Sequence, residues 1–460
     1  MKAVRPAEWK PGQKQSLAPG GFGAPESPQL YSESLACFEN RWYTEKMFNL
    51  SRSIPRVLSI GAGLNASSIT LMKEPLDLLS AEGAVEHRFA LSGQARRTDI
   101  GWCDLCVFLQ TQENIDVRVL NAVQAAGKKA VFLADDDYLN IPPGHMKTPH
   151  FEYPHRRRNY LRFLQRCDLV LTTTGRLAGA FGGYAARPVY VFETLPVPDL
   201  YYAAPPRWSE DGVFRFLYAA SAFNYRHLMD IAAPAIVRVM EEYGPKVHFI
   251  FMGGDFPLGP PERRTVLGGR MPYYEFLEKF AAVTADAALA PLDRSEYSLG
   301  KSDLKYREYG PRGLAGIYSD TPVYAQSVRH GQTGLLAADG EDDWHAAMAR
   351  LIDNPAQARA MGLAARRQLE AGCTLRAFAD LWRDKIIGPA LTGDFAPAPL
   401  RPEEKKGGQA DLRRPAAFEL ARRRSQIWRR IRTFWYDAFY LDRNRAVVAL
   451  KKFLRRLFVV

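Results

Sequence analysis

Cysteine is scarce in this sequence, and long apolar segments free of charge are missing. Five of the 460 residues are cysteines, and their spacing predicts no disulfide framework. Cys103 and Cys106 form a lone CxxC inside an apolar run, which indicates buried thiols more than a redox or zinc site. No charge-free run could span a bilayer, and the first residues hold no apolar core of a secretory signal. These absences argue against secreted disulfide scaffolds and integral membrane proteins, and predict a cytoplasmic protein.

Positive charge is concentrated at one end of the chain. The net charge is +12, and residues 401–460 hold 17 lysines and arginines against 6 acidic residues. The first four hundred residues hold 45 against 44 and are nearly neutral. Any anionic partner is therefore expected to bind the C-terminal tail.

The chain between residues 51 and 200 alternates apolar runs with helical patterns. Residues 1–50 read as an extension with one helix near 31–48. The continuous apolar runs that follow predict buried parallel strands with helices on both faces of the sheet. These strands are expected at 56–60, 87–93, 104–110, 129–134, 168–173 and 189–194.

The same alternation restarts after a linker-like segment at 195–212. Strands are expected at 214–221, 246–254, 286–292 and 321–325, with helices at 227–243, 273–283, 341–353, 355–371 and 375–386. The fold class is therefore α/β, with two tandem Rossmann-like, doubly wound parallel-sheet domains and a ligand cleft at the carboxyl ends of the strands. The expected domains are 51–200, 201–370, a returning helix at 371–393, and a linker with a basic tail at 394–460.

A glycine-rich loop follows the first strand. GAGLNA, residues 61–66, fits the G-x-G-x-x-A form of a dinucleotide fingerprint, whose glycines let the backbone approach a phosphate. The second strand offers no acid for a ribose. We therefore interpret Gly61, Gly63 and Asn65 as a loop facing the cleft, with no cofactor of its own.

Three acids follow a buried strand in FLADDDYLN, residues 132–140. Adjacent carboxylates at a strand end are costly unless they bind something or cap the next segment. No histidine or further acid stands at ligand spacing, so we expect no metal. A role for Asp136 and Asp137 in the cleft and a solvated turn stay equally open.

Charged residues recur in two stretches of the second unit. If KSDLKYREYG, residues 301–310, is one helix, then Lys301, Lys305 and Glu308 share a face. Two cations and a carboxylate suit a ligand with phosphates and sugar hydroxyls, whereas a solvated, salt-bridged helix is the alternative. Arg226 and His227 open a helix and would add charge to an anion site there.

Seven motifs in order resemble the nucleotide-binding half of GT-B glycosyltransferases, specifically the retaining family 4 group. They are AASAFNYRH, FMGG, GRMPYYEFL, ADAALAPL, KSDLKYREYG, DTPVYA and HGQTGLL. DLVLTTTGRLAGAF and FLADDDYLNIPP resemble segments of the acceptor half. The resemblance covers residues 55–385, and it implies a nucleotide-sugar transferase.

The resemblance implies a role for each matching residue. Glu308 would bind the donor ribose, Lys305 the diphosphate or sugar, and Arg226 or His227 the diphosphate. The donor-binding set is Gly61, Gly63, Asn65, Arg226, His227, Arg270, Met271, Lys301, Lys305 and Glu308, with Arg270 and Met271 cradling the base. The catalytic set is Asp136, Asp137, His227 and Lys305.

One position departs from the family pattern. Family 4 enzymes commonly carry a second glutamate eight residues before the ribose-binding one, and Gly300 occupies that place here. Either Lys301 or Asp303 would have to replace it. A sugar-nucleotide epimerase of GT-B fold and a catalytically silent glycan-binding scaffold are therefore alternatives to a transferase.

The tail interleaves arginine and lysine with tryptophan, phenylalanine, leucine and valine. Residues 411–460 predict amphipathic helices with basic faces that would lie in an anionic membrane surface. A nucleic-acid tail is the rival, and the apolar closing stretch FLRRLFVV favours lipid over nucleic acid. The expected partners are a nucleotide sugar, a glycan or lipid-linked acceptor, and the inner face of the plasma membrane, in cell-envelope polysaccharide synthesis.

Overall fold

The computed structural model describes residues 54–143, 145, 153–187, 189–220, 224–269, 271–392 and 415–440. By its internal contacts the chain divides into Met1–Ser53 and Ile54–Val460, and the described residues belong to the second unit. The expected extension at 1–50 and, within the expected linker and basic tail, residues 394–414 and 441–460 lie outside the described ranges.

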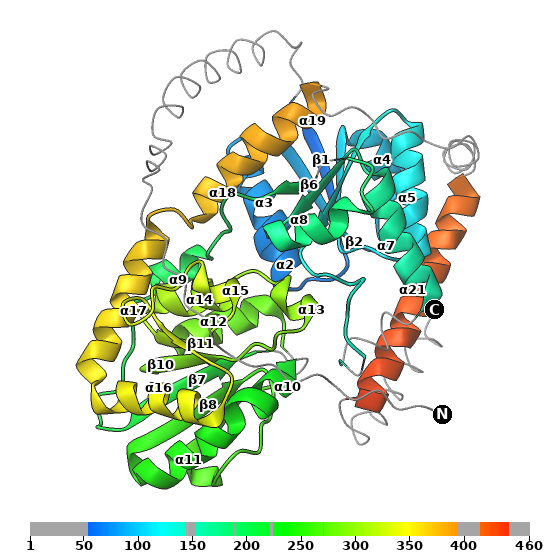
Figure 1. The fold of residues 1–460 in the computed structure, drawn as a ribbon. Coiled ribbons are helices and arrows are strands. Elements are labelled where there is room, and N and C mark those ends of the chain that lie inside the picture. The colour runs from blue at the N-terminus through cyan, green and yellow to red at the C-terminus, as the bar shows by residue number, and fades with distance from the viewer. Residues whose placement is uncertain are drawn as a thin grey trace, which may run out of the picture. The chain divides into compact units, whose positions relative to one another are not determined.

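Six parallel strands form the first sheet, in the order β2-β1-β3-β4-β5-β6 (Figure 1). They are β1 Arg56–Gly61, β2 Glu86–Leu91, β3 Leu105–Leu109, β4 Lys129–Ala134, β5 Leu169–Thr172 and β6 Val189–Val191. The connecting elements are α2 Ala66–Ser68, η1 Ile69–Lys73, α3 Glu74–Ala81, α4 Arg97–Trp102, α5 Asn114–Ala125, α7 Pro154–Arg166, α8 Gly175–Gly182 and α9 Asp199–Ala203.

The inner strands β1, β3, β4 and β5 are mostly apolar because both faces of the sheet are covered there. Leu58 and Ile60 belong to the core beneath α4, α5, α7 and α8. Val57 and Leu105 belong to the core on the opposite face, beneath α3. Continuous apolar strands are the signature of a parallel sheet with helices on both sides, as the sequence predicted.

Six parallel strands also form the second sheet, in the order β12-β11-β10-β7-β8-β9. They are β7 Phe214–Ala219, β8 Val247–Met252, β9 Arg264–Leu267, β10 Ala287–Ala290, β11 Ala315–Ser319 and β12 Leu335–Ala337. The helical elements are α10 Tyr225–His227, η3 Leu228–Ala232, α11 Ala233–Tyr243, η4 Gly244–Lys246, η5 Pro261–Arg263, α12 Tyr273–Ala282, α13 Glu296–Leu299, α14 Leu304–Tyr309, η6 Gly310–Arg312, α15 Pro322–Ala325, α16 Glu341–Asp353 and α17 Pro355–Glu370.

One strand expected in this second unit is wrong. Thr321 is the N-cap residue of helix α15, which spans Pro322–Ala325 and has Pro322 at its first position. A proline, which has no N–H, is favoured at that position. The strand lies earlier, at β11, whose sequence AGIYS is fully buried. This strand begins with the small residues Ala315 and Gly316, so its sequence shows no clear apolar run. The small size is required, because a side chain at Gly316 would collide with the ring of Tyr318.

The chain returns to the first sheet after α17. Helix α18 (Leu375–Leu381), η7 (Trp382–Ile387) and α19 (Gly388–Thr392) follow one another. Phe378 and Trp382 are buried in the core of the first sheet. The Trp382 indole N–H donates to the Leu71 carbonyl oxygen at 3.0 Å, so this segment packs against the first domain.

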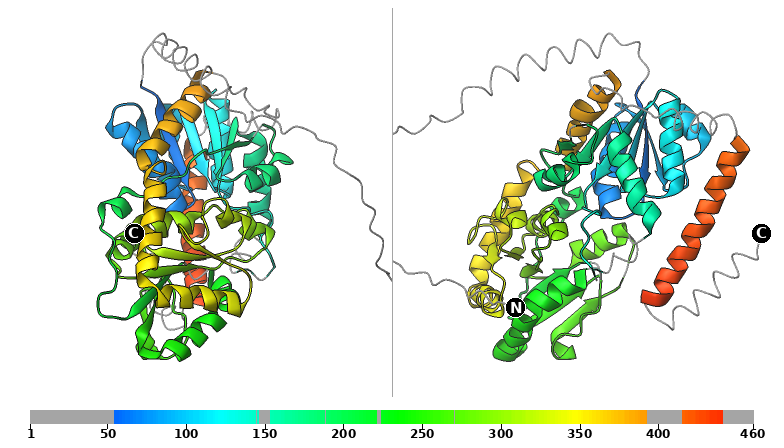
Figure 2. Two further views of the ribbon diagram at one scale, coloured as in Figure 1. Left: turned by 60° about the vertical axis from the view of Figure 1, so that its left-hand side comes forward. Right: turned by 45° about the vertical axis from the view of Figure 1, so that its right-hand side comes forward.

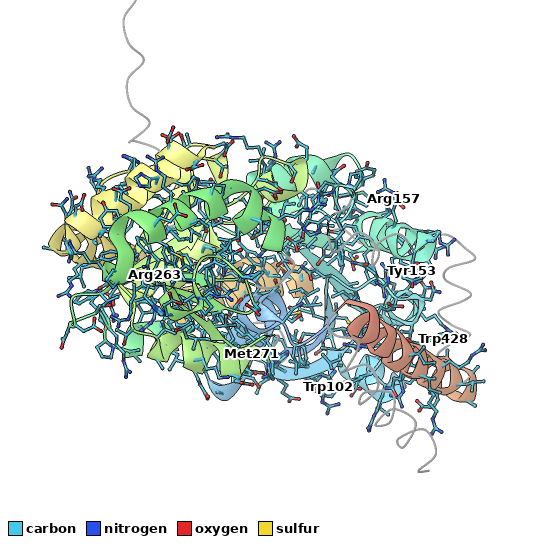
Figure 3. The ribbon with its side chains drawn as sticks, turned by 90° about the horizontal axis from the view of Figure 1, so that it is seen from below. Trp102, Tyr153, Arg157, Arg263, Met271 and Trp428 are labelled. Atoms are coloured by element: carbon cyan, nitrogen blue, oxygen red, sulfur yellow. The ribbon has the colours of Figure 1, made fainter. Side chains whose placement is uncertain are left out.

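The C-terminal tail contributes helix α21, Pro415–Tyr440. Phe418 is 2 % exposed and sits in the first sheet's core together with residues of α4 and α5, and α21 runs beside α5 (Figures 1 and 2). Trp428 lies on its outer side (Figure 3) and is 58 % exposed. The first half of the helix is therefore part of this domain, not a tethered appendage. Within the described ranges, no helix has the length and apolarity needed to cross a membrane.

Candidate functional site

Loops at the carboxyl ends of the two sheets meet one another. Thr174, after β5, donates its hydroxyl to the carbonyl oxygen of Gly300, which lies beyond β10, at 3.0 Å. Arg176 forms an ion pair with Glu296 across the same boundary. Parallel strands place their carboxyl ends at one edge, which is where doubly wound sheets bind ligands. The candidate site is therefore lined by both domains.

Asp136 lies at the centre of this junction. Its carboxylate is 2.9 Å from Lys301 Nζ and accepts a hydrogen bond from the Tyr297 hydroxyl at 3.2 Å. Lys301 also lies 4.4 Å from the centre of the Tyr297 ring. Tyr297 is 1 % exposed, and burial raises the pKa of its hydroxyl, which stays a hydrogen-bond donor. Two predicted site residues, Asp136 and Lys301, thus neutralise each other.

The other two acids of the triplet point to partners within the first domain. Asp137 is 3 % exposed and accepts hydrogen bonds from the Leu139 N–H at 3.2 Å and the Asn140 amide at 2.7 Å. Asp135 accepts from the side chain of Gln110. Asp137 therefore holds the turn after β4, the capping role that the sequence left open, and its catalytic role stays a prediction.

The stretch from 301 to 310 is not one helix, so one expectation was wrong. Helix α14 begins at Leu304, and Lys301 follows the C-terminal Gly300 of α13. Lys301 therefore shares no face with Lys305 and turns toward the first domain. Asp303, the other residue proposed to replace the missing glutamate, accepts from Arg307 at 2.9 Å and from Ser327 at 2.6 Å.

Lys305 and Glu308 form an ion pair on α14. Glu308 is 4 % exposed, whereas the Lys305 side chain is 19 % exposed. A buried carboxylate is expensive without a cation or donor beside it. The two side chains therefore neutralise each other on this short helix, and their contact with a donor stays a prediction.

His227 is 3 % exposed at the end of α10. Its Nδ1 accepts the backbone N–H of Asp293 at 3.1 Å, so the neutral ring carries its proton on Nε2. Burial lowers the pKa of His227, the nearby Asp293 carboxylate opposes this, and Lys301 adds to the lowering. His227 is therefore a neutral Nε2–H donor near Lys301. Arg226, the residue before it in α10, is exposed.

The glycine loop leaves β1 at Gly61. A Cβ there would lie 2.8 Å from the Ser68 hydroxyl, whereas Gly63 has open space around it. The Asn65 side chain accepts from the Ser68 N–H at 2.9 Å and caps α2. Gly61 is thus required by packing and Asn65 by capping, and their contact with a donor stays a prediction.

The base-cradling pair is described only in part. Met271 is half-buried just before α12 and lies near Gly268, where a Cβ would meet its methyl group at 3.0 Å. Arg270 lies outside the described residues.

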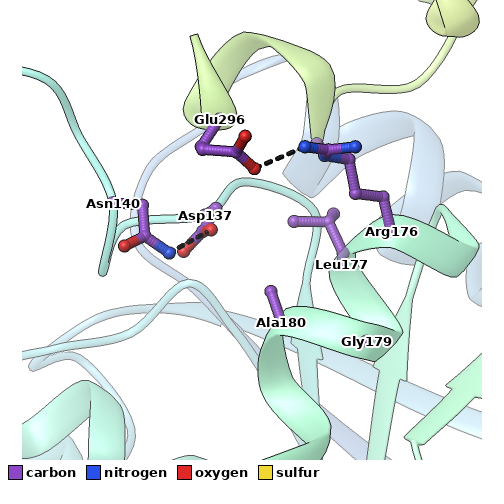
Figure 4. Close-up of a pocket in the computed structure, with 8 residues that line it drawn as sticks. Asp137, Asn140, Arg176, Leu177, Gly179, Ala180 and Glu296 are labelled. Atoms are coloured by element: carbon purple, nitrogen blue, oxygen red, sulfur yellow. Dashed lines mark hydrogen bonds and ion pairs between the residues drawn. The ribbon is translucent and has the colours of Figure 1, made fainter. Parts of the chain in front are cut away.

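A pocket opens between the first domain's α8 and the second domain's α13 (Figure 4). Arg176, Glu296 and Asn140 give it polar walls, and the sequence interpretation missed all three. Two signals were present, since Arg176 follows a strand within TTTGR and Glu296 follows the loop after ALAPL. The lining residues are Asp137, Asn140, Arg176, Leu177, Gly179, Ala180, Glu296 and Gly300.

Metal-ligating side chains do not gather anywhere in the part of the chain that the structure describes. There, no three histidine, cysteine, aspartate or glutamate residues are placed to hold an ion. Cys103 and Cys106 are free and buried, and burial raises the pKa of Cys103 to about 11. They pack as core thiols, as the sequence predicted.

Comparison with known proteins identifies the fold class of the two domains. No protein-family model matches the sequence, and no curated protein matches it either. HepE from Anabaena, solved in complex with UDP and glucose, is similar with a TM-score of 0.51 and 13 % identity over 72 % of this chain and 99 % of HepE. WaaG, a glycosyltransferase involved in lipopolysaccharide biosynthesis, gives 0.48 and 14 % over 72 % and 99 %. Sucrose-phosphate synthase from Thermosynechococcus elongatus gives 0.48 and 12 % over the same shares. The two Rossmann-like domains are those of the GT-B fold.

Proposed function

We propose that this protein is a glycosyltransferase that moves a sugar from a nucleoside-diphosphate sugar to a glycan or lipid-linked acceptor. The observation that carries the proposal is the Lys305–Glu308 ion pair on α14, whose carboxylate is buried, at the ligand-binding edge of a GT-B fold. The family 4 resemblance, a hexosyl-type transfer and retention of configuration belong to the same proposal. HepE, which has this fold, was solved with UDP, so UDP is the first nucleotide to test.

Donor binding would exchange the partners of this ion pair. Lys305 would turn to the diphosphate, and Glu308 would accept hydrogen bonds from the two ribose hydroxyls. Each charge keeps a partner throughout, so neither is left buried alone. His227 would donate its Nε2–H to the same diphosphate, and Arg226, its neighbour in α10, would add positive charge.

The transfer step needs the leaving diphosphate to be stabilised. The bond between the sugar's anomeric carbon and the phosphate oxygen breaks while the bond to the acceptor oxygen forms on the same face. The acceptor's proton passes to the departing phosphate oxygen. Lys305, His227 and Arg226 would stabilise the negative charge that develops there, an electrostatic effect that is often the largest contribution to catalysis.

The acceptor would enter through the pocket beside α8. Its polar walls, made by Asn140, Arg176 and Glu296, match the hydroxyls of a sugar, and its small residues leave room for a ring. Asp136 is the chain neighbour of the lining residue Asp137 and is held by Lys301 and Tyr297. An acceptor hydroxyl that reached Asp136 would lie on the donor side of the junction.

The biological setting is proposed from the tail. A basic and aromatic C-terminal segment suits an enzyme at the cytoplasmic face of a membrane. Extension of a lipid-linked glycan for a cell-envelope polysaccharide would need that location, because the acceptor is itself held in the bilayer.

A binding titration tests the donor site. Purified protein is titrated with UDP, GDP, dTDP and CMP, and the same is done with Glu308→Gln. Glu275→Gln is the matched control, since Glu275 pairs with Lys279 on the exposed side of α12. Selective binding of one diphosphate, weakened about tenfold in Glu308→Gln alone, is expected. Absence of binding by all four to folded protein would overturn the proposal.

Product analysis separates the alternatives. Donor plus acceptor should yield a glycosylated product with the anomeric configuration of the donor. Epimer formation from the donor alone would identify an epimerase, and diphosphate binding with neither product would identify a silent scaffold.

A further inference from the structure

Helix α21 has an inner face that packs on the first domain and an outer face that is exposed to solvent. Its inner face is occupied by the first domain: Phe418 is buried in the core and Ser425 lies against Gly93. Arg429 donates one guanidinium hydrogen bond to the Ser92 carbonyl at 2.9 Å and another to the Ala62 carbonyl at 2.8 Å. Gln426 adds a bond to the Gly93 carbonyl at 3.2 Å. The helix therefore cannot rotate about its axis without losing these contacts.

The outer face carries large apolar side chains in contact with solvent. Leu420 is 60 % exposed, Ile427 48 % and Trp428 58 %. Their spacing of seven and eight residues keeps them on one side of the helix. Because the opposite face is fixed, these side chains stay largely in contact with solvent.

Arginines stand among these apolar residues. Arg423 and Arg424 are exposed beside Ile427 and Trp428, and the Arg423 side chain, 72 % exposed, shares Glu419 with Arg422. Helix α21 holds six arginines against two acids. Cations that alternate with leucine, isoleucine and tryptophan fit a surface that is anionic outside and apolar beneath it.

We infer that the outer face of α21, formed by Leu420, Arg423, Arg424, Ile427 and Trp428, docks on an anionic lipid surface. Arginines bind lipid phosphates, and Trp428 and Ile427 insert at the level of the headgroups. This inference rests on the membrane association proposed above, and it assigns that association to one face of one helix. The pinned inner face then fixes how the first domain, with its glycine loop, sits on the membrane.

A nucleic acid would need the arginines but not the apolar side chains. Phosphate contacts alone give binding that falls steeply with salt. An inserted tryptophan and isoleucine give a component that salt does not screen. Lipid is therefore the partner that uses the whole face.

Vesicle sedimentation with the full chain tests the inference. Vesicles of phosphatidylcholine with phosphatidylglycerol are compared with phosphatidylcholine alone, for wild type, Arg423→Gln/Arg424→Gln and Ile427→Ser/Trp428→Ser. Each pair is expected to weaken binding to the anionic vesicles about tenfold. The matched controls are Arg350→Gln/Arg367→Gln, on α16 and α17, and Tyr274→Ser, an exposed aromatic on α12, and these should bind as wild type does.

Insertion is read directly by quenching with brominated lipid. Wild-type tryptophan fluorescence should be quenched, and Trp428→Phe should lose most of that quenching. Absence of vesicle binding, binding unchanged in both α21 pairs, or binding to duplex DNA in preference to vesicles would each overturn the inference. Diphosphate titration of the same variants, expected to match wild type, separates a failed membrane face from a failed donor site.

Discussion

Lys301 Nζ lies 2.9 Å from Asp136 Oδ1, although 165 residues separate the two in the sequence. They follow strands of different sheets, and their side chains are 24 % and 13 % exposed. The contact therefore joins the two domains at the edge where a ligand would bind. A ligand that needs either charge must first compete with this ion pair.

Competition of this kind predicts opposite effects for two substitutions. Asp136→Asn keeps the shape of the side chain and releases Lys301 from its counter-charge, so a diphosphate should bind about three- to tenfold more tightly. Lys301→Met should weaken binding by a similar factor. Calorimetric titration measures both, with Asp211→Asn as a control at an exposed pair with Arg215. Shifts of the same sign would contradict the competition.

The Lys305–Glu308 pair predicts unequal costs for its two partners. Lys305→Met leaves the 4 % exposed Glu308 carboxylate without its cation, at a cost of about 2–4 kcal/mol in the free energy of unfolding. Glu308→Gln leaves a lysine that can reach solvent, and should cost about 1 kcal/mol. Urea unfolding measures the difference in the free energy of unfolding between the two variants, provided that their denaturant m-values agree. Equal losses would mean that the carboxylate has another partner in solution.

The buried His227 predicts a fixed tautomer and a low pKa. Burial lowers its pKa, so between that value and about 6.5 the unfolded chain binds more protons than the folded one. Its contribution to stability is therefore present at neutral pH and is lost as the pH falls through the lowered pKa. Nitrogen-15 NMR should show Nε2–H at pH 7.5. A protonated Nδ1 at that pH would contradict the hydrogen bond from Asp293.

Asp116 predicts a pH effect of the opposite sign. It is fully buried, accepts from the Ser92 hydroxyl at 2.5 Å and the Gly93 N–H at 3.2 Å, and burial raises its pKa to about 7. The folded chain therefore binds more protons than the unfolded one from about pH 4 to 7, and this contribution to stability falls as the pH rises. Asp116→Asn should flatten the fall by about 2 kcal/mol between pH 5 and 8. Unfolding curves at pH 5 and pH 8 measure this difference. An equal fall in the free energy of unfolding in Asp116→Asn and in wild type would contradict the raised pKa.

The two carbonyl contacts of Arg429 predict that the tail helix depends on this side chain. Arg429→Gln removes the guanidinium that binds Ala62 and Ser92, so amide hydrogens beyond residue 424 should exchange about tenfold faster. Arg424→Gln, at an exposed position, is the control and should leave exchange unchanged. Equal protection in both variants would show that the other inner-face contacts, including those of Phe418 and Gln426, hold the helix without Arg429.

The fold was predictable because the inner strands of its sheets are buried on both faces. Runs such as 129–134 are apolar without alternation, and only a covered parallel sheet explains them. Strand β11 escaped because Ala315 and Gly316 carry no apolar pattern, while the more apolar 321–325 begins with a threonine and a proline that favour a helix start. Local composition was a poor guide where tertiary packing demands small residues.

The candidate site was predictable by residue type but not by partner. Glu308 and Lys305 follow from helical spacing, since both lie within α14. Lys301 does not, because a turn at Gly300 redirects it to Asp136 on the other domain. The docking of α21 was also invisible, since Arg429 binds carbonyl oxygens that every residue possesses.

That last contact has a consequence for how this sequence can vary. Arg429 binds the backbone carbonyl oxygens of residues 62 and 92 and not their side chains. Substitutions at those two positions therefore leave both hydrogen-bond acceptors in place. Among homologues, position 429 should then stay arginine, and no other position should covary with it. A search for coupled substitutions would not detect it, although it joins the last described helix to the loops that follow β1 and β2.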